Sequence, residues 1–167
     1  MVSDAPEEQR PESPGEARAR AAIEASGVEH VIVRHGPARS LAEAAAARGV
    51  APSSLIKTMV VRRGEGDYLF VLVPGDRTIS WPKLRALLGV SRLSMPDAAT
   101  ALDVTGFERG TITPFGATHA WPVVADERVH GVVSIGAGGH GVGIRLDGAA
   151  LTTALAAQVA DVTEPEA

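Results

Sequence analysis

The sequence predicts a single α/β domain of the α+β type, with helices flanking a mixed, curved central sheet of about six or seven strands. Its length of 167 residues suits one domain. With 45% hydrophobic residues and no cysteine, it can bury a core without disulfide bonds or thiolate metal sites. Hairpin-like strand pairs alternate with helical segments, which is more typical of a mixed sheet than of a doubly wound parallel one.

The two ends of the chain are expected to be tails, so that the domain spans residues 17–163. Residues 1–16 contain five acidic residues, three prolines and one arginine. Burial cannot offset the entropy of ordering such a segment. Residues 164–167 have the same acidic, proline-containing composition. The remaining charges nearly balance, which does not fit a protein that grips long nucleic acid, and no DNA partner is expected.

The first half of the chain predicts two helices and three strands. A first helix precedes a short β-branched strand. Ser40 and Glu43 then form a capping box before an alanine-rich helix, which Gly49 ends. Two strand-like runs follow, and the glycine-rich residues 64–67 between them predict a hairpin turn. In chain order these elements span residues 16–26, 30–35, 41–48, 56–63 and 68–73.

The second half predicts three helices and three short strands around an irregular stretch. Pro82 lies in the first turn of a helix that Gly89 closes. Residues 105–119 show no period, which indicates a loop. Asp147 is the predicted cap of the last helix. In chain order these elements span residues 81–88, 96–102, 123–124, 132–135, 142–146 and 148–158.

The sequence shows no sign of a membrane or secretory protein. Its longest clean apolar run, Tyr68 to Val73, is too short to cross a bilayer. No charged start followed by an apolar stretch marks a signal peptide. We therefore expect a cytoplasmic protein without a membrane partner.

Lysine is rare in this chain, with 14 arginines against two lysines, Lys57 and Lys83. Since arginine fills most basic positions, a remaining lysine is a candidate for a site that needs a compact, flexible charge. Lys83 has an ordinary explanation on the solvated face of a predicted helix. Lys57 begins an apolar strand, where it is either an outward-facing strand residue or a functional group.

Two glycine-containing segments are candidates to surround a ligand. In residues 105–116 (TGFERGTITPFG), free backbone amides can hold a carbonyl oxygen or a phosphate; an ordinary turn-rich connection is the alternative. Residues 134–143 hold five glycines. They do not form a phosphate loop, because no Lys-Ser/Thr pair closes them and a strand follows instead of a helix. This second segment predicts a tight hairpin beside a pocket.

Several catalytic classes lack their residues. The chain has no cysteine nucleophile, and its five histidines lack the usual metal-ligand spacing, so neither a metal nor another cofactor is expected. No serine lies in a G-x-S-x-G elbow, and no paired carboxylates indicate a glycosidase. Any mechanism must therefore depend on positioning and backbone donors.

Three segments, in order, resemble the YbaK-type family of aminoacyl-tRNA deacylases, relatives of the editing insertion domain of bacterial prolyl-tRNA synthetase. The segment LIKTMV resembles the strand that bears the family's functional lysine, here Lys57. Residues 105–116 resemble the family's G-x-x-x-P loop, here Gly110 to Pro114. Residues 134–146 resemble its glycine-bearing hairpin. The resemblance covers residues 17–163.

The resemblance implies a trans-editing hydrolase that cleaves the ester of an aminoacyl-tRNA mischarged with a small amino acid, on tRNA-Pro or a related tRNA. The implied catalytic residue is Lys57, which would bind the phosphate or ribose end of the acceptor strand. The implied partners are the aminoacyl-tRNA acceptor end and, as a further candidate, an aminoacyl-tRNA synthetase. The implied substrate-binding residues are His35, Thr58, Gly106, Gly110, Thr111, Pro114, Ser134, Gly136, Gly138 and His140.

One position departs from the family pattern. Some members carry an acidic residue in the last hairpin where this chain has Gly143, so no role of that carboxylate transfers and no general base is assigned. The alternative function is a catalytically silent binding module that uses the same pocket for a nucleotide, an aminoacyl group or a synthetase partner. The presence of Lys57 and of the glycine–proline loop favours the enzyme.

Overall fold

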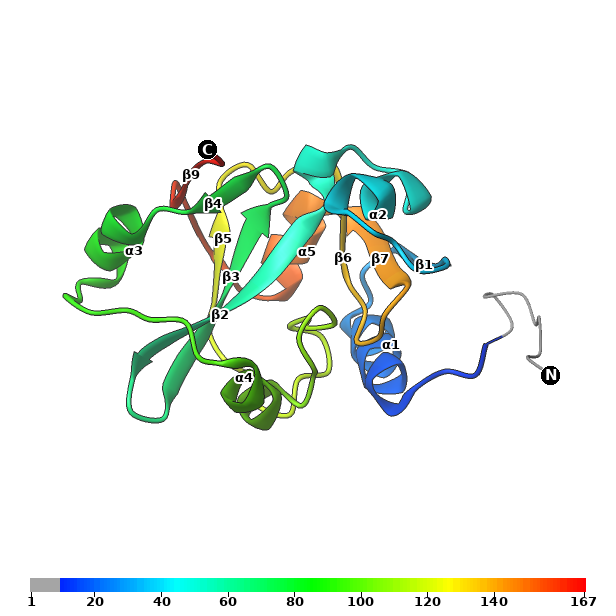
Figure 1. Cartoon of the computed structure of the whole chain (residues 1–167), viewed down its shortest axis with the longest axis horizontal. Helices are drawn as coiled ribbons and strands as arrows, with labels where there is room; N and C mark the ends of the chain where they lie inside the picture. Colours follow the sequence, from blue (N-terminus) through cyan, green and yellow to red (C-terminus); the bar gives the residue numbers. More distant parts are fainter. Residues whose placement is uncertain (1–9) are drawn as a thin grey trace.

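The computed structural model describes residues 10–167 (Figure 1); the first nine residues of the expected acidic tail lie outside this part of the chain. Within residues 10–167, no helix is long and apolar enough to cross a membrane. The helices are α1 Pro14–Ser26, α2 Leu41–Ala47, the short 3-10 helix η2 Pro52–Ser54, α3 Trp81–Leu88, α4 Ala98–Thr105 and α5 Gly148–Ala154. The strands are β1 His30–Arg34, β2 Ile56–Gly64, β3 Asp67–Pro74, β4 Arg77–Ile79, β5 Val123–Asp126, β6 Val132–Gly136, β7 Val142–Asp147, β8 Gln158–Ala160 and β9 Thr163–Pro165.

These strands form three sheets. β1, β7 and β6 make an antiparallel sheet in that order. β2, β3, β5 and β8 make a mixed sheet, antiparallel between β2 and β3 and parallel beyond. A bridge between Leu55 and Ser134 brings the start of β2 beside β6, while β4 and β9 form a separate antiparallel pair. The predicted α+β class with mixed strands is confirmed, although the described residues form nine strands.

Two apolar clusters hold the sheets in place. The larger contains Ile23 of α1 and Leu151 of α5, both fully buried, together with side chains of β2, β3 and β5 in the mixed sheet and of β6 and β7 in the antiparallel sheet. The smaller lies on the opposite face of β3 and contains Val71 and Leu84 of α3. Each fully buried side chain of this size contributes roughly 1.5–3 kcal/mol of transfer free energy. β3 is covered by apolar side chains on both faces, and β2 pairs with this buried strand.

Most predicted helix ends and turns are confirmed. The Ser40 hydroxyl accepts a hydrogen bond from the Glu43 N–H (3.1 Å), and the Glu43 carboxylate accepts one from the Arg39 N–H (3.1 Å). Gly89 ends α3 in the left-handed conformation, with φ of 66°. The expected hairpin joins β2 and β3. These local signals therefore specify the framework around β2.

Helical and strand structure extends beyond the predicted limits of the domain at both ends of residues 10–167. The helix expected from residue 16 begins at Pro14, with Ser13 as its cap. Glu16, expected in the tail, is only 5% exposed because its carboxylate pairs with Arg34 at 3.0 Å. At the other end, residues 164–165 belong to β9 and pair with β4. The acidic composition of residues 1–16 did not indicate that Glu16 is buried, because its partner Arg34 comes from β1.

The last helix is shorter than the sequence predicts. The prediction extends it through Gln158, but α5 ends at Ala154. Ala156 has a φ of 50°, a left-handed conformation that a right-handed helix does not accommodate. The chain then enters β8, which runs parallel to β5. β4, β8 and β9 have three residues each, too few to show a period in the sequence.

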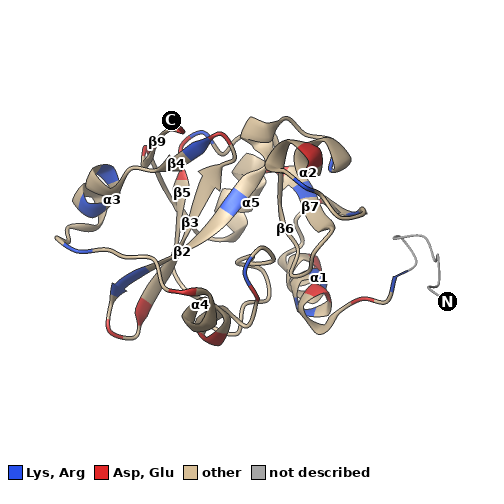
Figure 2. Ribbon diagram, in the orientation of Figure 1, with Lys and Arg blue, Asp and Glu red and all other residues tan. Residues whose placement is uncertain are grey.

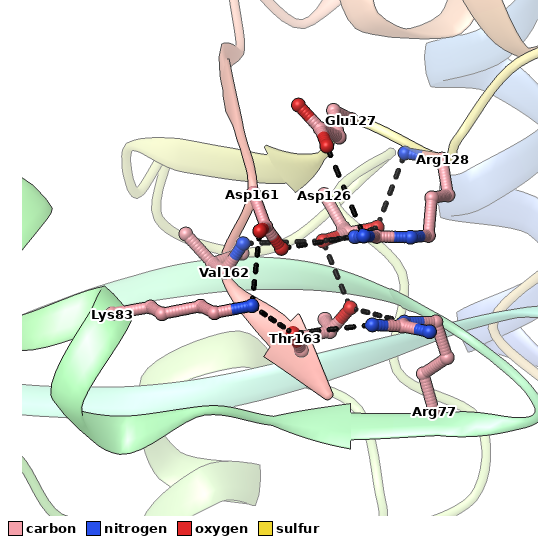
Figure 3. A network of polar contacts seen from close by, with 8 residues as sticks. All are labelled: Arg77, Lys83, Asp126, Glu127, Arg128, Asp161, Val162 and Thr163. Carbon is pink, nitrogen blue, oxygen red and sulfur yellow. Dashed lines mark hydrogen bonds and ion pairs between the residues drawn. The ribbon is translucent and has the colours of Figure 1, made fainter. Parts of the chain in front are cut away.

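A polar network fixes the C-terminal strands to the sheet (Figure 3). Asp126, at the end of β5, is fully buried. Its carboxylate accepts hydrogen bonds from the Val162 N–H (3.2 Å), the Thr163 hydroxyl (2.9 Å) and the Arg128 N–H (3.1 Å). One buried carboxylate thus joins β5 to the chain that enters β9.

Lys83 and Asp161 extend this network toward the surface (Figure 3). The Lys83 ammonium donates to the Asp161 carboxylate and to the Thr163 carbonyl oxygen, both at 2.9 Å. Arg128 also donates to Asp161, at 3.0 Å. The hydrogen bonds from Lys83 and Arg128 lower the pKa of Asp161 to about 2. Lys83 therefore has a structural position between α3 and β9.

Gly138, between β6 and β7, lies against the start of α1. A Cβ atom there would overlap the carbonyl oxygen of Gly15, and φ is +81°. We expect Gly138→Ala to lower the free energy of unfolding by about 2–4 kcal/mol, because overpacking adds to the cost of the left-handed backbone. Gly66→Ala is the control, with φ of +65° and nothing within 4 Å of its Cβ position. Urea unfolding should show the smaller loss for the control; equal losses would contradict the importance of the Gly15 contact.

Candidate functional site

A cavity of about 640 Å³ lies along β2. This volume is within the range of ligand and cofactor sites in proteins. Its walls come from α2, β2, the start of α4 and the loop after α4; Figure 1 shows where these elements lie in the fold. The lining residues are Leu41, Ala44, Arg48, Leu55, Ile56, Lys57, Thr58, Met59, Val60, Met95, Pro96, Asp97, Ala98, Ala101, Arg109, Gly110, Ile112 and Gly136.

Lys57 lies in β2, opposite Val73 of β3. Its side chain is 26% exposed, so it does not extend into bulk solvent. The ammonium donates a hydrogen bond to the Arg77 carbonyl oxygen (2.7 Å) and lies 3.9 Å from the Glu166 carboxylate. Since a lysine ammonium has three donors, this bond leaves further donors available. Lys57 is therefore a cavity-lining residue whose ammonium is anchored by one hydrogen bond and still has hydrogen-bond donors to offer.

Thr58 lies on the other face of β2, because successive strand residues point to opposite faces. It shares this face with Ile56 and Val60 of the larger apolar cluster. Within residues 10–167, its buried hydroxyl has no hydrogen-bond partner. An unpartnered buried hydroxyl costs roughly 1–3 kcal/mol.

The loop after α4 brings backbone donors to the cavity. Gly110 has a φ of +88°, a conformation that favours glycine. The N–H groups of Gly110 and Ile112 donate no hydrogen bond within the described part of the chain. A Cβ atom at position 136 would lie 2.8 Å from the Ile112 carbonyl oxygen, so glycine at 136 allows β6 to approach this loop. Both Gly110 and Ile112 line the same cavity as Lys57.

The charged residues around the cavity make it electropositive. Arg48, Lys57 and Arg109 line it, against the single carboxylate of Asp97. That carboxylate caps α4 by accepting from the Thr100 N–H (2.8 Å), which lowers its pKa. Elsewhere the basic residues are scattered over the ribbon and form no continuous stripe in this view (Figure 2). The cationic character is thus local, as a small anionic group requires.

The structure brings four of the predicted site residues to the cavity: Lys57, Thr58, Gly110 and Gly136. Two others lie beside it. The His35 ring accepts a hydrogen bond from Arg48, which lines the cavity. His140 is exposed, and its Cε1 atom lies 3.5 Å from the Cβ position of Gly110.

The other five predicted residues do not line the cavity: Gly106, Thr111, Pro114, Ser134 and Gly138. Gly106 ends α4. The Thr111 hydroxyl donates to the Glu108 carbonyl oxygen (2.7 Å), and the Gly138 N–H donates to the Thr111 carbonyl oxygen (3.1 Å). Ser134 is fully buried in β6, opposite Arg145, and Pro114 is half-buried. These positions fit a role in shaping the loop and the hairpin.

Sequence reasoning missed Arg48, Met95 and Asp97 as cavity residues. Arg48 follows an alanine-rich helix, and only the packing of that helix beside β2 and β7 brings the side chain to the site. Within residues 10–167, no group of three or more histidine, aspartate or glutamate side chains could hold a metal ion.

The protein is thus an α+β domain with one ligand-sized cavity that three basic residues line. The sequence model of the aminoacyl-tRNA editing domain matches residues 35–154, and the chain belongs to this family.

Prolyl-tRNA synthetases are among the relatives of this chain. The chain is 29% identical over 107 residues to the proline–tRNA ligase of Bacillus licheniformis, covering 64% of this chain and 18% of the ligase. It is 35% identical over 91 residues to that of Desulfotalea psychrophila, covering 54% of this chain and 15% of the ligase. The chain thus spans less than a fifth of the length of these ligases.

Solved structures agree with this family. The crystal structure of a protein proposed to be a trans-editing enzyme for prolyl-tRNA synthetase matches with a TM-score of 0.83 and 28% identity. The match covers 91% of this chain and 98% of that one. The expected relationship to the prolyl-tRNA editing domain is therefore confirmed.

Proposed function

We propose that this protein is a deacylase that hydrolyses the ester of a mischarged aminoacyl-tRNA. The observation that carries the proposal is one cavity whose lining includes Lys57, Thr58, Gly110 and Ile112. Within residues 10–167, the N–H groups of Gly110 and Ile112 have no hydrogen-bond partner. Membership in the editing family and the match to a proposed trans-editing protein support action on aminoacyl-tRNA in trans.

The proposed reaction is attack of water on the ester carbonyl carbon. The C–O bond to the terminal ribose then breaks, releasing the amino acid and leaving the ribose hydroxyl protonated. An aminoacyl ester is already activated, so the protein needs only to place the reactants and stabilise the developing oxyanion. The N–H groups of Gly110 and Ile112 are the proposed donors to that oxyanion. The neighbouring ribose hydroxyl or the substrate's own side chain can assist the proton transfer, so no protein base is assigned.

In this proposal Lys57 contacts the phosphate or ribose of the acceptor end. A lysine side chain is a flexible point charge, which suits a phosphate that must enter and leave. Thr58, Gly110 and Gly136 would surround the acyl group. His35, Gly106, Thr111, Pro114, Ser134, Gly138 and His140 would hold the backbone or the neighbouring side chains in place.

The cavity volume bears on the substrate. About 640 Å³ is more than a small acyl group fills, so we infer that the terminal nucleoside enters as well. A small amino acid on tRNA-Pro is the proposed substrate. The aminoacylation site of a synthetase discriminates against an amino acid that lacks one methylene by only about 1–3 kcal/mol. A second pocket is therefore needed to hydrolyse tRNAs charged with smaller amino acids. Alanine, cysteine, serine and threonine are the candidate acyl groups.

A catalytically silent binding module is the second candidate function. The observation that favours it is the position of the Lys57 ammonium, which donates to the Arg77 carbonyl oxygen and lies near Glu166. In such a module these contacts would persist with ligand bound. An aminoacyl-tRNA synthetase is a candidate partner in either case.

A deacylation assay tests the proposal directly. Purified protein is incubated with tRNA-Pro charged separately with alanine, cysteine, serine, threonine and proline, and loss of the acyl label is followed. We expect at least one small acyl group to be released much faster than in buffer, with proline spared. Saturable binding of these tRNAs without release of any acyl group would identify the silent module instead.

A further inference from the structure

Arg48, the C-terminal cap of α2, lies over Gly143 of β7. A Cβ atom at position 143 would lie 2.6 Å from the Arg48 Cδ and 2.7 Å from its Nε. The arginine stem therefore fills the space that a side chain at 143 would need. Arg48 also lines the 640 Å³ cavity. Glycine at position 143 therefore leaves the room that allows the arginine to lie at the cavity wall.

A histidine holds this guanidinium in place. The Arg48 Nε donates to the His35 Nε2 (3.1 Å), and the His35 Nδ1 is 2.7 Å from the Gly36 carbonyl oxygen. Arginine has no acceptor, so the His35 Nε2 must be unprotonated, and its Nδ1 then carries the hydrogen. This chain of two hydrogen bonds fixes the plane of the guanidinium and leaves its two terminal nitrogens, Nη1 and Nη2, for another partner.

Among residues 10–167, no acidic side chain pairs with Arg48. Within residues 10–167, no carboxylate lies within 4 Å of its guanidinium, and Nη1 and Nη2 donate no hydrogen bond. Burial lowers the pKa of Arg48, although the group stays charged. Arg145, which donates to the Arg48 carbonyl oxygen (3.3 Å), adds a second positive charge nearby. A desolvated cation without a counter-ion is costly unless an anion binds beside it.

We propose that Arg48 is a phosphate-binding residue of the cavity, and that it binds a phosphodiester of the acceptor end of the substrate through Nη1 and Nη2. A planar guanidinium matches two oxygens of one phosphate, which a lysine cannot do with a single nitrogen. The inference rests on the proposed function for the identity of the ligand. The geometry of Arg48, His35 and Gly143 assigns the residue that binds it.

Binding of small probes to the full chain tests this assignment without any turnover. The probes are the trinucleotide CpCpA, which carries the phosphodiesters, and adenosine, which carries none; affinities are measured by calorimetry. We expect the wild-type protein to bind CpCpA more tightly than adenosine. Arg48→Met, which keeps a stem over Gly143, should lower the affinity for CpCpA at least about tenfold, with adenosine binding unchanged.

Two further variants complete the experiment. Arg92→Met removes an exposed arginine that does not line the cavity and should leave both affinities unchanged. Arg48→Lys keeps the charge without the fork and should recover only part of the CpCpA affinity. If Arg48→Met fails to fold, the CpCpA affinity of Arg48→Lys tests the role of Arg48 instead. Full recovery by lysine would overturn the two-nitrogen contact.

The carboxylate of an acidic acyl group is the other source of an oxyanion. A non-hydrolysable glutamyl ester analogue of adenosine, compared with its alanyl counterpart, distinguishes it. Loss of glutamyl selectivity in Arg48→Met with unchanged CpCpA affinity would overturn the phosphodiester assignment. If the wild-type protein hydrolyses mischarged tRNA but Arg48→Met binds CpCpA and adenosine as tightly as the wild type does, the role of Arg48 is overturned and the proposed function stands. Failure of the wild-type protein in the hydrolysis assay, with Arg48-dependent CpCpA binding retained, would overturn only the proposed function.

Discussion

Replacing Lys57 by methionine is expected to lower the rate of deacylation about 100-fold or more, while the fold stays intact. Lys57 lines the cavity and has donors left after its bond to Arg77. In its proposed role it positions the acceptor end, and misplacing a reactant by about 1 Å typically costs about 10²-fold in rate. The free energy of unfolding should fall by at most about 1.5–3 kcal/mol, the contribution of one hydrogen bond from a charged group. Single-turnover hydrolysis of mischarged tRNA-Pro and urea unfolding measure the two quantities.

The chain offers a matched control in its other lysine. Lys83 donates to Asp161 and to the Thr163 carbonyl oxygen and does not line the cavity. Lys83→Met should therefore leave the hydrolysis rate unchanged at a comparable loss of stability. An unaffected rate in Lys57→Met would refute the assigned role. A loss of several kcal/mol in that variant, with a rate that falls only in proportion to the folded fraction, would show that Lys57 is a structural strand residue.

The framework of the site could be predicted because its signals are local. The capping box at Ser40, the turn at residues 64–67 and the β-branched runs of β2 and β3 each depend on a few neighbouring residues. The fold class follows from their order. The same holds for Gly110, whose positive φ needs the glycine that the loop pattern singled out. Each of these features needs no knowledge of long-range packing.

The cavity itself could not be predicted, because its walls meet only through tertiary packing. Arg48 is 95 residues from Gly143 in sequence, and nothing in either segment indicates that the arginine stem covers the glycine. Glu16 was hidden in the same way, since its partner Arg34 comes from β1. Glycines 106 and 138 illustrate the opposite case: the pattern identified them, but they end a helix or allow a close approach and do not line the cavity.

Asp126→Ala is expected to lower the free energy of unfolding by about 3 kcal/mol. The carboxylate is fully buried, and its removal leaves the Val162 N–H and the Thr163 hydroxyl without their acceptor. Each unsatisfied buried group costs roughly 1–3 kcal/mol. Arg128 also loses a partner, but it is 37% exposed and keeps Asp161, so its contribution is small. In a domain of this size such a loss corresponds to a fall in Tm of roughly 6–12 °C.

The neighbouring carboxylate provides the control for this prediction. Glu127 is 52% exposed and only approaches Arg128, at 3.8 Å, so Glu127→Ala should change stability by less than about 0.5 kcal/mol. Thermal and urea unfolding of both variants measure the difference. Asp126→Ala should also loosen β9, which pairs with β4 next to the carbonyl that holds Lys57, so faster amide exchange is expected at residues 162–165. Equal stability of the two variants would mean that the buried carboxylate does not hold the C-terminal strand in place.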